Sequence, residues 1–116
     1  MLPKNRRLRR RDEIIAVMRG RRVGSPRLVV HYAQHPSQAQ RSPARMGLAV
    51  ARKVGNSVTR HRVARRVRHV FAMDTAAWDA LDCDIVVRVL PAGAQVTSAQ
   101  VAADMARARS VMEDRL

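Results

Sequence analysis

The amino-acid sequence predicts a single domain that mixes helices and strands. Its 116 residues suit one domain, and a hydrophobic content of 47% is ordinary for a globular chain. Short β-branched stretches alternate along the chain with longer segments whose apolar residues recur at helical spacing. No internal repeat and no second domain is visible. We therefore expect one core within residues 1–116, with a basic N-terminal arm at about residues 1–11.

The first half of the chain predicts a mobile arm, a short helix and two strands. Six of the eight residues from Lys4 to Arg11 are basic and cannot pack against one another. The stretch DEIIAVMRG (12–20) has near-helical apolar spacing and ends at a glycine. RLVVHYA (27–33) and RMGLAVA (45–51) have the composition or alternation of strands. Because only a polar, proline-bounded loop separates them, we expect an antiparallel hairpin.

The second half predicts a basic helix, one further strand and a closing helix. After a turn at Gly55, either Asn56 or Ser57 can cap a helix. DIVVRVL (84–90) is typical of a strand. The stretch TSAQVAADMARARSVMEDR (97–115) opens with Thr and Gln at the two positions of a capping box and carries apolar residues along one side. A C-terminal helix should therefore close the domain.

The basic helix, which should extend to about Met73, has two unlike faces. At 100° per residue, three valines and Phe71 fall within one apolar arc, with Arg60 near its edge. The opposite side carries only cationic or titratable residues: His61, Arg62, Arg65, Arg66, Arg68 and His69. A solvated helix face normally includes Glu at i±4, and here there is none. Binding of a polyanion is therefore a better interpretation than a solvated face.

The charge of the whole chain supports this interpretation. There are 23 Lys and Arg against 9 Asp and Glu, a formal net charge of +14. Residues 1–73 hold 19 basic and 2 acidic side chains, whereas residues 74–116 hold 4 basic and 7 acidic ones. A field of one sign over half the protein favours a nucleic-acid or an anionic-membrane partner. We expect no membrane partner, because the apolar face of the helix is Val and Phe sized for a core.

Composition argues against several other functions. Three aromatic residues are too few for a stacking sheet, and the lone Cys83 excludes an internal disulfide and a Cys-rich zinc site. No Ser, His and Asp arrangement can be placed, and His31 with His35 is a weak metal pair, so we expect no catalytic and no metal residues. Asp82 and Asp84 could bind a cation but better fit a solvated turn. The absence of a long apolar run predicts a soluble, cytoplasmic protein.

One long stretch, GLAVARKVGNSVTRHRVARRVRHVF (47–71), resembles the signature of the bacterial ribonuclease P protein subunit. In that signature a strand ending in two basic residues leads through Gly-Asn into a helix with an Arg-Asn-Arg motif. The opening LPKNRRLRRRDEIIAVMRGRR, the LVVH strand and DIVVRVLP extend the resemblance over nearly the whole chain. It implies a two-layer α/β sandwich like a domain of a small-subunit ribosomal protein, with about four strands, three helices and a left-handed β-α-β crossover, against the usual right-handed rule.

The same resemblance implies an accessory role in an RNA-based enzyme. The protein would bind ribonuclease P RNA and precursor tRNA and assist endonucleolytic removal of the 5′ leader, while the catalytic centre lies in the RNA. Mg²⁺ would be held mainly by the RNA subunit and the substrate, and none tightly by the protein. A protein monomer in a 1:1 ribonucleoprotein, located in the cytoplasm, is the expected assembly.

Residue by residue, the resemblance implies two surfaces. The Arg-Asn-Arg motif falls on Arg60, His61 and Arg62, so His61 replaces the usual Asn, and Ala64 stands where a basic residue often lies. The implied RNA-subunit-binding residues are Arg52, Lys53, Asn56, Arg60, His61, Arg62, Arg65, Arg66 and Arg68. The implied leader-binding cleft, between the first helix and the sheet, comprises Ile14, Met18, His31 and Tyr32. Relatives often use aromatic residues there, so stacking should be weaker, and Ile14 or Met18 taken alone is more commonly a core residue.

Two alternatives from other classes remain open. A ribosomal protein that binds rRNA structurally would show a similar size, charge and fold. An architectural protein for duplex DNA would need Asn, Gln or Arg aimed at base edges, and residues 57–72 offer Arg without Asn or Gln. The preferred RNA and the effect on tRNA processing would distinguish these proteins from a ribonuclease P subunit.

Overall fold

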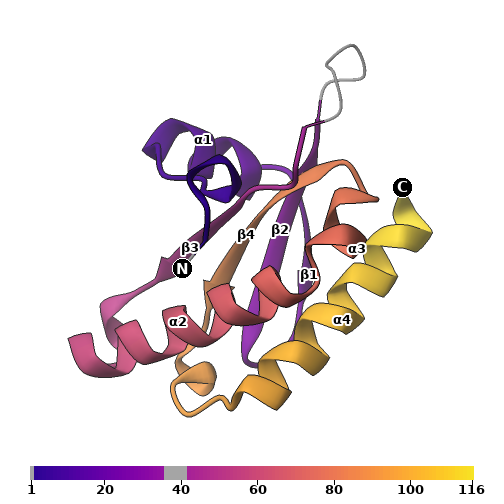
Figure 1. Ribbon diagram of the computed structural model, residues 1–116. Helices are drawn as coiled ribbons and strands as arrows, with labels where there is room; N and C mark the ends of the chain where they lie inside the picture. The colour runs from indigo at the N-terminus through magenta and orange to yellow at the C-terminus, as the bar shows by residue number, and fades with distance from the viewer. Residues whose placement is uncertain (1, 36–41) are drawn as a thin grey trace.

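One mixed sheet of four strands organises the protein (Figure 1). The structure is a computed structural model that describes residues 2–35 and 42–116. The strands are β1 (Arg21–Gly24), β2 (Leu28–Gln34), β3 (Met46–Val50) and β4 (Cys83–Val89). The helices are α1 (Arg11–Met18), α2 (Ser57–Met73), α3 (Thr75–Asp79) and α4 (Ser98–Arg115), with short 3-10 turns η1 (Lys4–Arg6), η2 (Arg52–Val54) and η3 (Pro91–Gly93). The mixed α/β prediction is confirmed.

The strand order is β1-β2-β4-β3, which corrects the predicted hairpin. β2 pairs antiparallel with β1 and with β4, and β3 pairs in parallel with β4. β4 therefore lies between β2 and β3, and the prediction that the stretches 27–33 and 45–51 pair with each other is wrong. The reason is burial: β4 is apolar and buried along almost its whole length, as a strand covered on both faces must be. The edge strand β1, RRVG, was not predicted because only one of its residues is apolar and buried.

The connection from β3 to β4 has the unusual hand that the resemblance implies. In Figure 1 both strands run down the view, β3 lies to the left of β4, and α2 crosses in front of the sheet. When this view is rotated in its plane so that both strands point upward, β3 lies to the right of β4. The chain then passes from β3 on the right, through α2 in front of the sheet, to β4 on the left. This β-α-β unit is left-handed, an exception to the usual right-handed crossover.

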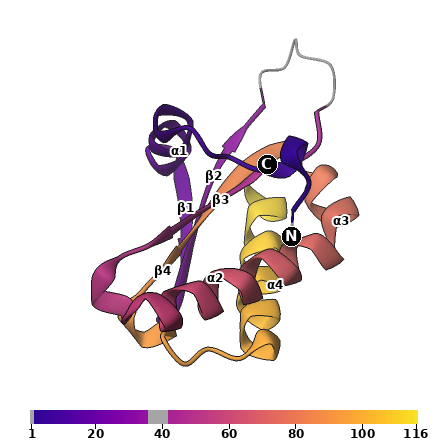
Figure 2. The same ribbon diagram turned by 60° about the vertical axis from the view of Figure 1, so that its left-hand side comes forward.

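Helices cover the two faces of the sheet unequally (Figure 2). α2, α3 and α4 lie on one face, over the larger core, whereas α1 lies on the other. In the larger core the rings of Phe71 and Trp78 lie 6.1 Å apart between centroids, and both are almost completely buried. α3, which the sequence did not predict, is a five-residue turn anchored by Trp78. The smaller core comprises Leu8, Val17 and Val86, with half-buried neighbours from α1.

Both predicted helix caps are present. The Asn56 side chain accepts a hydrogen bond of 2.9 Å from the Thr59 N–H at the start of α2. Thr97 and Gln100 form the reciprocal bonds of a capping box at the start of α4. These side chains bond amide groups that would otherwise lack a partner in the first helical turn. Of the two residues that could cap α2, the structure uses Asn56.

The basic N-terminal arm packs against the domain, contrary to the expectation that it is mobile. Leu2 and Leu8 are buried, and the Leu8 N–H donates a 3.1 Å hydrogen bond to the Met46 carbonyl at the sheet edge. The Arg6 guanidinium donates two hydrogen bonds of 2.8 Å to the two carboxylate oxygens of Asp79 on α3. The prediction weighed only charge repulsion. It could not include an acid 73 positions away or the apolar anchors between the arginines.

Candidate nucleic-acid interface

Helix α2 presents a row of cations along its solvent side. Its apolar side is fixed by Val63, Val67 and Phe71, each fully buried against the sheet. That packing turns the opposite side outward, where His61, Arg65, Arg68 and His69 are exposed. Among the described residues, no carboxylate lies within ion-pair distance of any arginine of this helix. The row can therefore form charge-assisted hydrogen bonds with an external anion.

The remaining residues of the predicted RNA-binding set have more varied surroundings. Arg52 and Lys53 are exposed in η2, just before the helix. Arg60 and Arg62 are half-buried, and the Arg60 Nε is enclosed without a hydrogen-bond partner among the described residues. Arg66 differs most, because its Nη1 donates a 2.7 Å hydrogen bond to the Val96 carbonyl. That bond ties α2 to the segment before α4, so part of the Arg66 guanidinium has a structural role.

A hollow of about 750 Å³ lies where the N-terminal segment meets α2 and the edge strand β3. We call it the basic groove. Its lining combines apolar and cationic or titratable side chains and includes no carboxylate: Leu2, Arg7, Leu8, Arg9, Met46, Gly47, Leu48, His61, Arg65, Arg68, His69 and Ala72. Sequence reasoning did not place Arg7 and Arg9 beside α2, because the two segments lie some fifty positions apart. Only the folded N-terminal segment brings them together.

The residues predicted to form the leader cleft lie, apart from Tyr32, on the opposite face of the sheet, beside α1. Ile14 and Met18 are half-buried there and pack with Leu8, Val17 and Val86. His31 is 4% exposed, and neither ring nitrogen has a well-formed hydrogen bond to a described residue. Burial, and then the nearby cations Arg88 and Arg22, lower the pKa of His31, and the Met18 backbone opposes this only in part. The imidazole is therefore neutral at neutral pH, and both of its nitrogen atoms are enclosed.

Tyr32 does not belong to this cleft. It is 2% exposed within the larger core, and Arg115 Nη1 lies 3.5 Å from its hydroxyl oxygen. The reason is strand geometry, since successive side chains point to opposite faces of a sheet and His31 already points toward α1. Two arginines lie near His31 and replace Tyr32 as candidate RNA contacts on this face. Arg22 is directly opposite His31 in the strand register, and Arg88 lies on β4. Arg88 could have been suspected as the one charged residue inside an otherwise apolar strand segment, IVVRVL.

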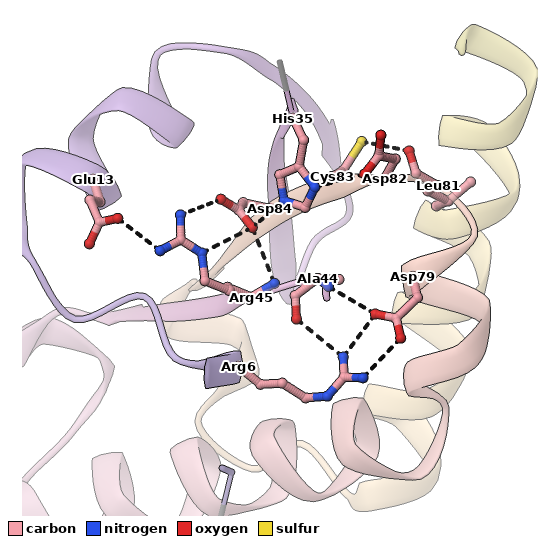
Figure 3. A network of polar contacts seen from close by, with 10 residues as sticks. All are labelled: Arg6, Glu13, His35, Ala44, Arg45, Asp79, Leu81, Asp82, Cys83 and Asp84. Atoms are coloured by element: carbon pink, nitrogen blue, oxygen red, sulfur yellow. Dashed lines mark hydrogen bonds and ion pairs between the residues drawn. The ribbon is translucent and has the colours of Figure 1, made fainter. Parts of the chain in front are cut away.

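A buried polar network holds α1, β2 and β4 together (Figure 3). His35 Nδ1 lies 2.8 Å from Asp82 Oδ1, and His35 Nε2 lies 2.7 Å from Asp84 Oδ1. Arg45 binds Asp84 at 2.8 Å and Glu13 of α1 at 2.9 Å. Asp82 and Asp84 are therefore not the solvated turn that the sequence favoured. They bind cationic groups of the protein itself.

In this network the hydrogen bonds and ion pairs together shift the pKa values of His35 and Asp84 more than burial does. Burial alone would lower the pKa of His35, but hydrogen bonds to Asp84 and Asp82 raise it above its ordinary value. Burial alone would raise the pKa of Asp84, but bonds from Arg45 and His35 lower it. Because carboxylates only accept, a histidine bonded to two of them carries a proton on each nitrogen. The network is thus a set of alternating charges beside α1.

Two further features concern residues 2–35 and 42–116. No helix there is both long and apolar enough to cross a membrane. Over the same ranges, no group of three or more His, Cys, Asp and Glu side chains is placed to hold a metal ion. What the described residues do provide is cationic surface.

Together the left-handed β-α-β unit, the cationic face of α2 and the basic groove define a class: small α/β proteins with one strongly cationic helix face. Comparison with known proteins narrows the class. The family model for ribonuclease P matches residues 2–113. The ribonuclease P protein component of Rhodococcus erythropolis is 44% identical over 107 residues, 88% of this chain and 84% of that one. That of Streptomyces avermitilis is 40% identical over 111 residues, 90% and 89% of the two chains.

The chain belongs to the ribonuclease P protein family. Solved structures agree in fold: the ribonuclease P protein of Staphylococcus aureus superposes with a TM-score of 0.74 at 20% identity, covering 93% of this chain and 95% of that one. The protein from Thermotoga maritima gives 0.68 at 24% identity, with 87% and 92% covered. Family membership disfavours the ribosomal and the architectural DNA-binding alternatives.

Proposed function

We propose that this protein is the protein subunit of ribonuclease P, a tRNA-processing ribonucleoprotein, and that it binds the RNA subunit through α2 and η2. The observation that carries the proposal is the row of exposed cations on α2, without a protein counter-charge among the described residues, in a member of this family. Arginine suits this role because its planar fork can donate two hydrogen bonds to one phosphate. Each phosphate neutralised also releases counterions, which adds a salt-dependent term to the affinity.

The cleft under α1 is proposed to hold the single-stranded 5′ leader of precursor tRNA. Met18 and Ile14 offer half-buried apolar surface, and the enclosed ring nitrogens of neutral His31 lie beneath them without well-formed bonds to the described residues, so the leader would reach His31 only if α1 shifts. Arg22 and Arg88 lie close enough to His31 to lower its pKa and could bind the phosphates of the same strand. An unpaired strand gains both from apolar contact with its bases and from cations along its backbone. The cleft and α2 lie on opposite faces of the sheet, so both RNAs could be bound at once.

Cleavage itself is assigned to the RNA subunit, with Mg²⁺ held by that RNA and the substrate. Two carboxylates of the protein do not fit a metal role, because half-buried Asp79 is bonded to Arg6 and buried Asp84 is bonded to Arg45 and His35. The protein's part is to hold the two RNAs in a shared orientation and to screen their phosphate repulsion. One copy of this 13.0 kDa domain per RNA, in the cytoplasm, completes the proposal.

The test is to add the protein to a bacterial ribonuclease P RNA at low Mg²⁺ and to measure cleavage of precursor tRNA. We expect the rate of leader removal to rise. Arg65→Ala with Arg68→Ala should weaken binding of the RNA subunit at least tenfold, at roughly 1 to 3 kcal/mol for each charge-assisted bond lost. Both side chains are exposed, so folding should survive. No stimulation by the folded wild-type protein would refute the proposal.

A second pair of measurements separates the two surfaces. Met18→Glu with Arg22→Ala should lower the affinity of the assembled enzyme for tRNA that carries a leader and leave its affinity for mature tRNA unchanged. Binding of the RNA subunit should also be unchanged, because neither residue lies on α2 or in the basic groove. If this variant loses the RNA subunit as severely as the double arginine variant, the protein has one undivided basic surface.

A further inference from the structure

The basic groove contains a stretch of open sheet edge. β3 is an edge strand, because the strand order places β4 on only one side of it. The Ile85 N–H donates to the Arg45 carbonyl, so the backbone groups of residue 45 point toward β4. The Met46 carbonyl instead accepts from Leu8, so the groups of residue 46 point outward. Alternation along the strand then points the N–H and C=O of Leu48 outward as well.

The N-terminal segment leaves this part of the edge uncovered. Among the described residues, it pairs with β3 only at Met46, through the bridge to Arg7 and the bond from Leu8. The chain then departs into α1, and no described residue bonds to the outward N–H and C=O of Leu48. Leu48 is half-exposed and lines the groove. The edge strand that lines the hollow therefore has one donor and one acceptor, side by side, without a partner among the described residues.

Apolar surface and cations surround these two groups. Leu2, Leu8 and Ala72 line the hollow from the N-terminal segment and α2, while Arg9, Arg65 and Arg68 line it as well. Its volume of about 750 Å³ lies within the range of roughly 300–1,000 Å³ that small-molecule pockets occupy. An unpaired nucleotide has the matching parts: an apolar base face, a base edge with a donor beside an acceptor, and a phosphate. A duplex does not, because its base edges are already paired.

We propose that the basic groove receives one unpaired nucleotide of the partner RNA, with the base on the apolar lining and its edge paired to the backbone of Leu48. The inference rests on the proposed RNA-binding function and makes it more specific. The contact on this part of the surface is to a bulged or looped nucleotide, in addition to phosphates along α2. The lack of any carboxylate in the lining favours RNA over an extended peptide, which would use the same open edge by strand addition.

The experiment uses the full chain and three RNA hairpins: one with a fully paired stem, one with a single unpaired nucleotide in the stem, and one with an abasic residue at that position. The nucleotide bulge should bind about tenfold more tightly than the abasic bulge, as expected for one stacked base. The abasic hairpin controls for the flexibility and the extra phosphate of a bulge. Protection of the Leu48 amide from hydrogen exchange should appear with the nucleotide bulge and not with the abasic one.

Two matched variants locate the effect. Ala72→Leu adds aliphatic bulk to the groove without changing its charge and should remove most of the preference for the base. Ala103→Leu places the same side chain on an exposed position of α4, away from the groove, and should leave the preference intact. Both should bind the fully paired hairpin like wild type.

The outcomes distinguish the inference from the proposed function. Equal binding of the nucleotide and abasic bulges, with the paired hairpin still bound, overturns the inference alone. A base preference that Ala72→Leu leaves intact, or that does not protect the Leu48 amide, also overturns it. Protection of that amide by an uncharged extended peptide and not by RNA assigns the edge to strand addition. Failure of all three hairpins to bind at low salt overturns the RNA-binding function as well.

Discussion

At the scale of single residues, neighbours in the sequence have different roles because the fold surrounds them differently. Arg65 and Arg66 are adjacent, yet Arg65 is exposed and Arg66 is bonded to the Val96 carbonyl. His31 and Tyr32 are adjacent, yet they face opposite sides of the sheet. Helical periodicity could predict which arginines lie opposite the valines, because it needs only the sequence. It could not predict a bond to a carbonyl thirty positions away, and so the role of Arg66 was only partly predictable.

The charged network around His35 predicts a dependence of stability on pH. The pKa of His35 is raised in the folded state, so its contribution is fully present below the unfolded pKa near 6.5 and is lost as pH rises through the folded pKa. His31, with a lowered pKa, contributes in the opposite sense. His35→Gln keeps His31 and removes only the first contribution. The free energy of unfolding, measured in urea, should fall by on the order of 1 kcal/mol more for wild type than for His35→Gln between pH 5.5 and pH 8.5.

Equal pH dependence of the two proteins would show that the His35 bonds contribute no net stability. Asp84 does not confuse the comparison at these pH values. Its pKa is lowered, so its contribution is present above the unfolded pKa near 3.8 and is lost only as pH falls through the folded pKa.

At the scale of elements, local signals were predictive and long-range pairing was not. The periodicity of α2, the capping box of α4 and the composition of β2, β3 and β4 each reside in a short window of sequence, and each element is present. Strand order depends instead on which strand needs neighbours on both sides, and the hairpin expected between β2 and β3 failed for that reason. The candidate site likewise has one part that local sequence predicts and one part that depends on long-range packing. The exposed face of α2 was predictable, whereas the basic groove needs the N-terminal segment in place.

The docking of the N-terminal segment predicts slow hydrogen exchange in the free protein. The Leu8 amide donates to Met46 inside a packed region, so it should exchange well below the rate of an unstructured amide. The amides of the neighbouring Arg9 and Arg10 have no such bond to any residue that the structure describes, and they serve as internal controls. Asp79→Asn removes the charge that holds Arg6, and it should speed exchange at Leu8 without affecting the central strand β4. Exchange at Leu8 as fast as at Arg9 would show that the segment is undocked in solution.

At the scale of the whole molecule, several acidic residues form ion pairs with particular arginines, and none of these pairs involves α2. Asp104 pairs with Arg27 at 2.9 Å, Asp74 pairs with Arg109, and Asp79 pairs with Arg6. None of the described acids pairs with α2. The five arginines of α2 therefore contribute to the net charge of +14 without a described acid to offset them.

This distribution predicts how RNA affinity depends on salt. The logarithm of the association constant should fall linearly with the logarithm of salt concentration, with a slope of roughly 0.7 to 0.9 for each phosphate contacted. Arg65→Ala with Arg68→Ala should reduce the slope by the equivalent of about two contacts. Arg107→Ala, on exposed α4 away from the groove, should leave the slope unchanged. A wild-type slope near zero would exclude an electrostatic interface on α2.

The central place of β4 also matters while the protein is being made. Each β3–β4 pair joins residues 39 positions apart, as Met46 and Ile85 are, so the sheet cannot close until that strand has left the ribosome. Until then the emerging segment is strongly basic, with 19 basic and 4 acidic residues within residues 1–80, and it leaves the ribosome beside ribosomal RNA. We expect a fragment of residues 1–80 to show no cooperative thermal unfolding and to bind RNA without regard to structure. Because of the order of synthesis, we expect this polypeptide to bind RNA non-specifically at first. Selective RNA binding should begin only after β4 has been inserted into the sheet.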